Sequence, residues 1–159
     1  MDSNAEVAAS QWAVFSRTDI ETRWARARTL MADAGLGALL VSNEENFQYF
    51  TGSTGTLTLH YSLTRPAVLV FPSEGEPIAV IGAALVDSVK MCTYIEDVRG
   101  YADVVSFPYE MVIEAIGDLG LSGGKIGGEL GQEQRMGMPV GDYLAITQEL
   151  GQARFVNGA

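Results

Sequence analysis

The chain has 159 residues, of which 47% are hydrophobic and 19% are charged, a balance that favours one folded globular domain and argues against intrinsic disorder except at the ends. Its net charge of −10 disfavours nucleic acid as a partner, because an acidic protein repels phosphate backbones. No apolar run approaches the roughly 20 residues of a membrane span and no secretory signal is visible, so we expect a cytoplasmic protein without a membrane partner.

The N-terminal residues 1–14 are mostly small or polar and lack a hydrophobic period, which predicts a disordered leader. One domain is expected over residues 15–159. Cys92 is the only cysteine, so neither an intramolecular disulfide nor a cysteine-rich zinc site is available. Its apolar neighbours favour a small core side chain over a reactive thiol.

The first predicted helix carries a start signal, an apolar face and a stop signal. Thr18 and Glu21 form a capping-box pattern, which predicts that the helix begins there. Gly35 supplies the left-handed residue that ends a helix. The apolar residues at helical spacing are Ile20, Trp24, Ala27, Met31 and Ala34.

The next segments predict a buried strand, a short helix and a loop. The apolar run 38–41 is too short for a helix and has the length of a buried strand. Ser42 and Glu45 repeat the capping-box pattern, so we expect a helix that starts there and ends at Gly52. The Thr-, Ser- and Gly-rich segment 53–64 predicts an exposed loop or an irregular hairpin.

The second half of the chain alternates between strands and helices. The expected strands are 67–71, 78–81, 93–98, 125–130 and 154–156, and the expected helices are 83–91, one from Pro108 to Gly120, and 139–150. The first two of these strands should form an antiparallel hairpin, and the last helix should bury Tyr143, Leu144 and Leu150. This alternation predicts an α/β fold with a mixed sheet of about six strands flanked by helices.

Catalytic and metal-binding motifs are missing from the sequence. The glycines around Lys125 lack P-loop spacing, because Leu119 stands where the first glycine is needed and Ile126 follows the lysine. His60 is the only imidazole, and no nucleophile-elbow pattern is present. The acidic residues without metal-ligand spacing, which we expect on the solvent-facing sides of helices, are Glu44, Glu45, Glu110, Glu114 and Asp118. We therefore expect no catalytic residue and no metal ligand in this chain.

Several stretches of the sequence share a pattern with one known group of hydrolases. These stretches are FSRTDIETRWARARTLMADAGLGALLVS, ENFQYFTG, RPAVLVFPSEGEPIAVI, VRGY and KIGGELGQEQRMGMPVGDYLAITQELGQARFV. Together they resemble the N-terminal domain of the creatinase/prolidase family, which includes Xaa-Pro dipeptidases and aminopeptidases. The resemblance spans residues 15–156, and Glu129 with the run 133–135 strengthens it.

The resemblance implies a fold with a ribonuclease-H-like motif and a catalytic pita-bread domain that follows in the parent metallopeptidase. That C-terminal domain would hold two divalent metal ions such as Mn, Co or Zn, or none in creatinase. The resemblance also implies a homodimer in which this domain closes the neighbouring subunit's active site around a small carboxylate or dipeptide substrate.

The same resemblance places Arg65 where creatinase has an arginine that binds the substrate carboxylate. Creatinase has an aromatic residue two positions earlier, where this chain has Leu63, and this departure argues against creatine as the substrate. His60 and Tyr61 lie in the same expected loop and are further candidates for substrate contact. The alternatives are an arginine that pairs with a surface acid and two exposed polar side chains.

Two functions remain open from the sequence. The first is a non-catalytic structural and gating domain of a larger metallohydrolase. The second is a stand-alone small-molecule or protein-binding α/β module, with segment 53–65 as its recognition site. Autonomous catalysis is disfavoured because the required base and ligands are missing.

Overall fold

The computed structural model describes residues 13–53, 65–103, 105–121, 123–150 and 154–158. The described helices are α2 (Arg17–Ala34), α3 (Glu44–Thr51), the 3₁₀ turn η2 (Ala83–Leu85), α4 (Val86–Cys92), α5 (Glu110–Asp118) and α6 (Val140–Glu149). The described strands are β1 (Ala38–Val41), β2 (Val68–Pro72), β3 (Ile78–Gly82), β4 (Asp97–Tyr101), β5 (Lys125–Gly128) and β6 (Arg154–Asn157). None of the helices in these ranges is both long and apolar enough to cross a bilayer.

The six strands form one mixed sheet in the order β4-β3-β2-β1-β5-β6. β2 is antiparallel to both β1 and β3, whereas the pairs β3–β4, β1–β5 and β5–β6 are parallel. The predicted mixed α/β sheet and the predicted hairpin are therefore confirmed. β1 lies near the centre of the sheet and is parallel to β5. The two strands therefore finish at the same end of the sheet, where the loops that follow them meet.

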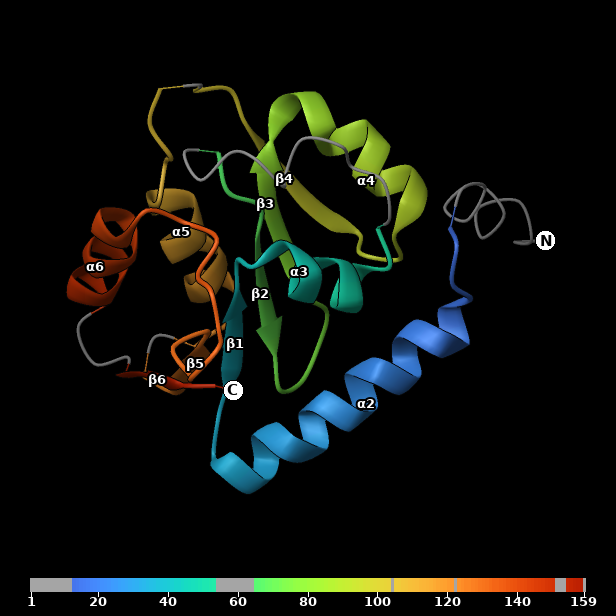
Figure 1. Cartoon of the computed structure of the whole chain (residues 1–159), viewed down its shortest axis with the longest axis horizontal. Helices are drawn as coiled ribbons and strands as arrows, with labels where there is room; N and C mark the ends of the chain where they lie inside the picture. Colours follow the sequence, from blue (N-terminus) through green and yellow to red (C-terminus); the bar gives the residue numbers. More distant parts are fainter. Residues whose placement is uncertain (1–12, 54–64, 104, 122, 151–153, 159) are drawn as a thin grey trace.

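Helices cover both faces of the sheet (Figure 1). The alternation of side chains along β2 separates the two cores, since Val68 and Val70 face α5 and α6 while Leu69 and Phe71 face α2, α3 and α4. Both sets are fully buried. Burial of such side chains contributes about 1.5–3 kcal/mol each, so this continuous apolar strand fixes the sheet between two helical layers.

Helix α2 begins with a capping box that lies before the predicted one. Ser16, not Thr18, is the N-cap: its hydroxyl accepts a hydrogen bond from the backbone N–H of Asp19 at 3.1 Å. The Asp19 carboxylate accepts the Ser16 N–H in return at 3.0 Å, so an aspartate completes the box. The Ser16 hydrogen bonds lower the pKa of Asp19. Gly35 ends the helix in the left-handed conformation as predicted, with φ of 65°.

Polar side chains of α2 bind it to the rest of this layer. The indole N–H of Trp24 donates to the Phe50 carbonyl at 2.8 Å, and Arg23 donates to the Tyr49 carbonyl at 2.9 Å. Arg28 donates to the carbonyl oxygens of the β2–β3 turn. Arg23 and Arg28 therefore bind backbone carbonyls of α3 and of the hairpin.

The predicted strand 93–98 is placed too early in the sequence, because β4 occupies Asp97–Tyr101. Thr93 accepts the N–H of Ile95 through its hydroxyl and makes a turn there. Gly100 explains the position of the strand, since a Cβ at this residue would lie 2.7 Å from Val86 and 3.0 Å from Ala83. The glycine lets η2 and α4 pack directly on β4.

The prediction for α6 is wrong at one of its three buried positions. Tyr143 and Leu150 are buried, but Leu144 is 57% exposed, and Ile146 takes its place in the core. Positions 143, 146 and 150 follow the helical period, whereas position 144 points about 100° away from it. The helix covers the same face of the sheet as α5.

Candidate functional site

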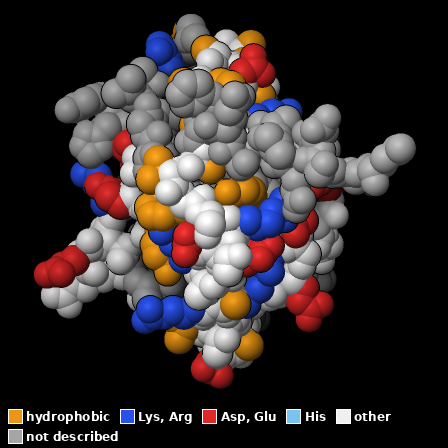
Figure 2. All heavy atoms as spheres, turned by 90° about the vertical axis from the view of Figure 1, so that its right-hand side faces the viewer, with side chains coloured by type: hydrophobic (Ala, Val, Ile, Leu, Met, Phe, Trp, Pro, Cys, Tyr) orange, Lys and Arg blue, Asp and Glu red, His pale blue; other side chains and the backbone are white. Residues whose placement is uncertain are grey.

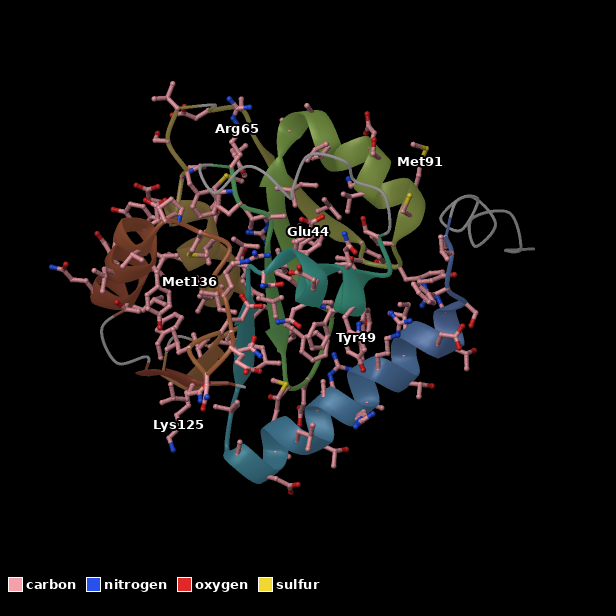
Figure 3. The ribbon with its side chains drawn as sticks, in the orientation of Figure 1. Glu44, Tyr49, Arg65, Met91, Lys125 and Met136 are labelled. Atoms are coloured by element: carbon pink, nitrogen blue, oxygen red, sulfur yellow. The ribbon has the colours of Figure 1, made fainter. Side chains whose placement is uncertain are left out.

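Two of the three predicted substrate-contacting residues, His60 and Tyr61, lie outside the described residues. The third, Arg65, is described, and its side chain is exposed just before β2. Figure 3 shows Arg65 at one end of the molecule and Lys125, which begins β5, at the other. This separation follows from the topology, because β2 runs opposite to β1 and β5.

Tyr101, the last residue of β4, fixes the backbone next to Arg65. Its hydroxyl donates a hydrogen bond to the Pro66 carbonyl at 2.8 Å, and its ring packs edge-on against Phe107 with centroids 5.3 Å apart. Burial raises the pKa of Tyr101 to about 12, although the positive charge of Arg65 acts in the opposite direction. Arg65 therefore projects from a rigid base, which is the arrangement of a loop residue carried by a fixed scaffold.

The carboxyl ends of β1 and β5 lie at a topological switch point. β1 leads to α3 on one face of the sheet, whereas β5 leads to α6 on the other face. In open α/β sheets such a divergence leaves a crevice beyond the strand ends, and ligands bind there. The N–H groups of Ser42 and Asn43, immediately before α3, point into this crevice and favour an anion.

In this protein the chain's own Glu129 carboxylate occupies that crevice. Oxygen Oε2 accepts three hydrogen bonds: from the Ser42 N–H at 2.9 Å, the Ser42 hydroxyl at 3.0 Å and the Asn43 N–H at 2.7 Å. Oxygen Oε1 accepts the Asn46 amide at 2.7 Å. The position in which this fold class holds an anionic ligand is thus filled by an internal carboxylate.

The predicted capping box at Ser42 is wrong because Ser42 serves this crevice instead. Asn43 is the N-cap of α3, and its side-chain oxygen accepts the Glu45 N–H at 2.9 Å. Asn43 also donates through its amide to the Arg135 carbonyl at 3.0 Å. The Ser42 hydroxyl accepts the Gly137 N–H at 3.0 Å while it donates to Glu129.

Gly137 closes the loop between β5 and α6 over the start of α3. A Cβ at this position would lie 1.9 Å from the Ser42 carbonyl oxygen, a distance that no side chain tolerates. The backbone of this loop therefore lies directly on the β1–α3 connection. The sequence resemblance marked Glu129 and residues 133–135, but only the structure gives them a common role: joining two loops across the switch point.

Beside this filled crevice, an open groove runs between α2, α3 and the ends of β5 and β6. Its volume is about 640 Å³, within the range of roughly 300–1,000 Å³ that ligand and peptide sites occupy. Two large apolar side chains on its walls are exposed, Leu30 at 61% and Tyr49 at 40%. The other lining residues are Arg26, Ala27, Met31, Ala34, Leu36, Leu39, Leu40, Val41, Asn46, Phe50, Gly127, Gly128, Gln134, Asn157 and Gly158.

The acidic residues expected on the surface are spread over several elements. Glu45, Glu110, Glu114 and Asp118 are exposed as predicted, whereas Glu44 is half-buried. Figure 2 shows acidic, basic and hydrophobic side chains mixed on the face it presents. Within the described ranges, no three His, Cys, Asp or Glu side chains lie close enough together to hold a metal ion.

The order of the strands and the two helical layers define the class: an α/β domain built on a mixed six-stranded sheet. A family model described as the creatinase/prolidase N-terminal domain matches residues 23–159, and the chain therefore belongs to this family. The resemblance stated from the sequence is confirmed. A comparison with curated protein sequences gave no significant match.

Solved structures with the same fold come from peptidases. A prolidase from Thermococcus sibiricus superimposes with a TM-score of 0.66 at 23% identity, over 87% of this chain and 34% of its own. A dipeptidase from Mycobacterium ulcerans gives a TM-score of 0.64 at 23% identity, over 89% of this chain and 35% of its own. This chain spans about a third of the length of these proteins.

A third structure has nearly the length of this chain. It is the creatinase-type N-terminal domain of a dipeptidase from Streptococcus thermophilus, with a TM-score of 0.64 at 20% identity, and the match covers 85% of this chain and 91% of that one. At such identities the likeness establishes the fold alone. The same architecture therefore occurs in the long peptidase chains and in a separately solved domain.

Proposed function

We propose that this chain is the non-catalytic N-terminal domain of a creatinase/Xaa-Pro dipeptidase-like metallohydrolase. The observation that carries the proposal is the family match over residues 23–159, together with a prolidase and a dipeptidase that are about two and a half times as long. In the proposed parent, a C-terminal pita-bread domain performs the hydrolysis with two divalent metal ions such as Mn, Co or Zn. The parent would be a cytoplasmic homodimer.

The domain's contribution is to dimer contacts and to closing the neighbouring subunit's active site. Arg65 supports this role, because it is an exposed cation on a backbone that Tyr101 holds in place. A guanidinium binds a carboxylate with two parallel hydrogen bonds, so Arg65 would orient the carboxylate of a dipeptide or of a related small substrate. Closure of the site by this segment would exclude water and larger substrates.

The reading frame beyond residue 159 tests the proposal directly. We expect a downstream segment of a few hundred codons with clustered acidic and histidine residues, since two metal ions need such ligands. A downstream sequence without any such cluster would contradict the proposal. Sedimentation of the longer protein would then test the homodimer.

Substitution of Arg65 in the longer protein tests its role in catalysis. Arg65→Ala should lower kcat/KM for Xaa-Pro dipeptides by about tenfold to a hundredfold, because a charge-assisted contact to the substrate contributes about 1.5–3 kcal/mol. Arg65→Lys should recover part of this loss, and Lys125→Ala is the matched control at the opposite end of the domain (Figure 3). Equal kinetics for Arg65→Ala and Lys125→Ala would show that Arg65 does not contact the substrate.

A second candidate function is a stand-alone binding module. The observation in its favour is that a solved domain of nearly this length has the same fold. Calorimetric titration of the 159-residue chain with dipeptides and carboxylate metabolites measures this function. Heat that disappears in an Arg65→Ala variant would favour recognition by the predicted segment 53–65, and no heat from any compound would count against a module of this kind.

A further inference from the structure

The groove between α2 and α3 is bordered by a regular stripe of α2. Arg26, Leu30 and Ala34 lie four residues apart, so they share one side of the helix. Leu30 is 61% exposed, and Arg26 forms no ion pair with any described residue. Tyr49 lines the opposite wall, where it projects from α3 (Figure 3). The walls therefore offer two large apolar side chains and one cation.

The floor of the groove includes the backbone at the ends of β5 and β6. Gly127 and Gly158 lie so close together that a Cβ on Gly127 would be 2.9 Å from the Cα of Gly158. The Gly158 N–H donates to the Gly128 carbonyl at 2.8 Å, which extends the pairing of β5 and β6 by one further hydrogen bond. Leu36 and Leu39 also line the groove, and their methyl groups would lie 2.9 Å and 2.8 Å from a Cβ on Gly127. The floor therefore combines the backbone at two strand ends with these two leucines.

We propose that this groove is the docking surface for the polypeptide that continues the parent enzyme beyond Gly158 and leads into its catalytic domain. This inference rests on the proposed function. Gly158, the last described residue, itself lines the groove, so a continuing segment would leave the described structure at the groove. The prolidase from Thermococcus sibiricus and the dipeptidase from Mycobacterium ulcerans have about two thirds of their length outside the matched region, which is a partner large enough to cover these walls.

The chemistry of the walls specifies the occupant. An apolar side chain of the continuing segment would cover Leu30 and Tyr49, and removal of this surface from water contributes about 25 cal/mol per Å². A carboxylate on the segment would pair with Arg26, whose charge is opposite to the net charge of the chain. β6 is an edge strand of the sheet and leaves backbone groups available to the same segment.

Thiol labelling can test the proposal with two matched positions. Leu30 and Leu144 are 61% and 57% exposed, but Leu144 lies on α6 on the other side of the sheet. Leu30→Cys and Leu144→Cys, each with the half-buried Cys92 replaced by Ala, are prepared both in the 159-residue chain and in the longer protein. In the longer protein, Leu30→Cys should react with a maleimide at least about tenfold more slowly than in the short chain, whereas Leu144→Cys should react at similar rates in both.

The outcomes separate this inference from the function on which it rests. If the downstream segment has catalytic motifs but Leu30→Cys reacts equally fast in both proteins, the docking surface is wrong and the proposed function stands. If no catalytic segment follows, both ideas fail. Protection of Leu30→Cys in the short chain that grows with protein concentration would assign the groove to a second copy, and protection only by an added dipeptide would assign it to a small molecule; each result overturns the proposal. Urea unfolding of every variant verifies that it is folded.

Discussion

The crevice between β1 and β5 and the groove under α2 lie side by side at the same strands, but the crevice is filled by the chain itself and the groove is open. In the crevice, Glu129 supplies the anion and Gly137 brings a loop close enough to cover it. In the groove, Gly127 and Gly158 supply only backbone, and Leu30 stays exposed. The difference teaches that the position where α/β folds bind small ligands is used here for internal support, while a neighbouring apolar surface is left for a partner.

The largest expected effect comes from reopening the crevice at Gly137. Gly137→Ala should destabilise the domain by about 3 kcal/mol, because the new Cβ would overlap the Ser42 carbonyl and force the two loops apart. Gly141→Ala is the control: its Cβ meets nothing within 4 Å, and an alanine inside α6 should add about 0.5–1 kcal/mol of stability. Urea unfolding measures both. Equal stabilities would mean that the loop is not held against Ser42.

Removal of the internal anion should have the next largest effect. Glu129→Ala leaves the Ser42 and Asn43 amides without their acceptor and should cost about 2 kcal/mol. Glu129→Gln should cost less, because one oxygen remains. The exposed Glu133→Gln is the control and should stay within about 0.5 kcal/mol of the original chain. If Glu129→Ala and the original chain have the same free energy of unfolding in urea, Glu129 does not stabilise the loops at the switch point.

Tyr101 extends the comparison to the Arg65 end of the sheet. Tyr101→Phe loses the hydrogen bond to Pro66 and should cost about 1 kcal/mol. The pKa of Tyr101 is about 12, above the ordinary value near 10, so burial favours the neutral phenol in the folded state. Its contribution to stability is therefore complete below pH 10 and should be lost as the pH rises from about 10 to 12.

Unfolding of the original chain and of Tyr101→Phe across this alkaline range, followed by circular dichroism, measures the effect. The variant should lose less stability than the original chain over the same interval. If the two curves fall in parallel, Tyr101 does not carry the alkaline dependence.

The smallest effect is expected at Leu30, an exposed residue of the groove wall. Leu30→Ser should change the stability of the 159-residue chain by less than about 0.5 kcal/mol, because this side chain is already exposed. Its neighbour Met31 is 2% exposed, and Met31→Ala should cost about 2–4 kcal/mol. Urea unfolding of both variants tests whether the groove wall contributes to folding. A large loss for Leu30→Ser would mean that the groove is part of the core.

Local sequence patterns predicted the helices and strands correctly where the whole signal lay within one segment. The left-handed glycines at 35 and 52 and the hairpin of β2 and β3 were predicted correctly, as was the apolar face of α2 except for Ala34, which is exposed. Errors occurred where two local signals competed. Ser16 and Asn43 act as caps in place of Thr18 and Ser42, because an aspartate can replace glutamate in the box and because Ser42 is used by Glu129.

The sequence by itself determined the mixed sheet, since periodicity, caps and turn residues act within a few positions, and its resemblance to a known domain identified the family. Only the tertiary structure decided the roles of Glu129 and Gly137, because Glu129 and Ser42 are 87 positions apart and meet only when β1 and β5 pair. It also decided the groove, whose lining residues come from α2, β1, α3 and the ends of β5 and β6. Such space depends on which segments become neighbours, and no single segment encodes it.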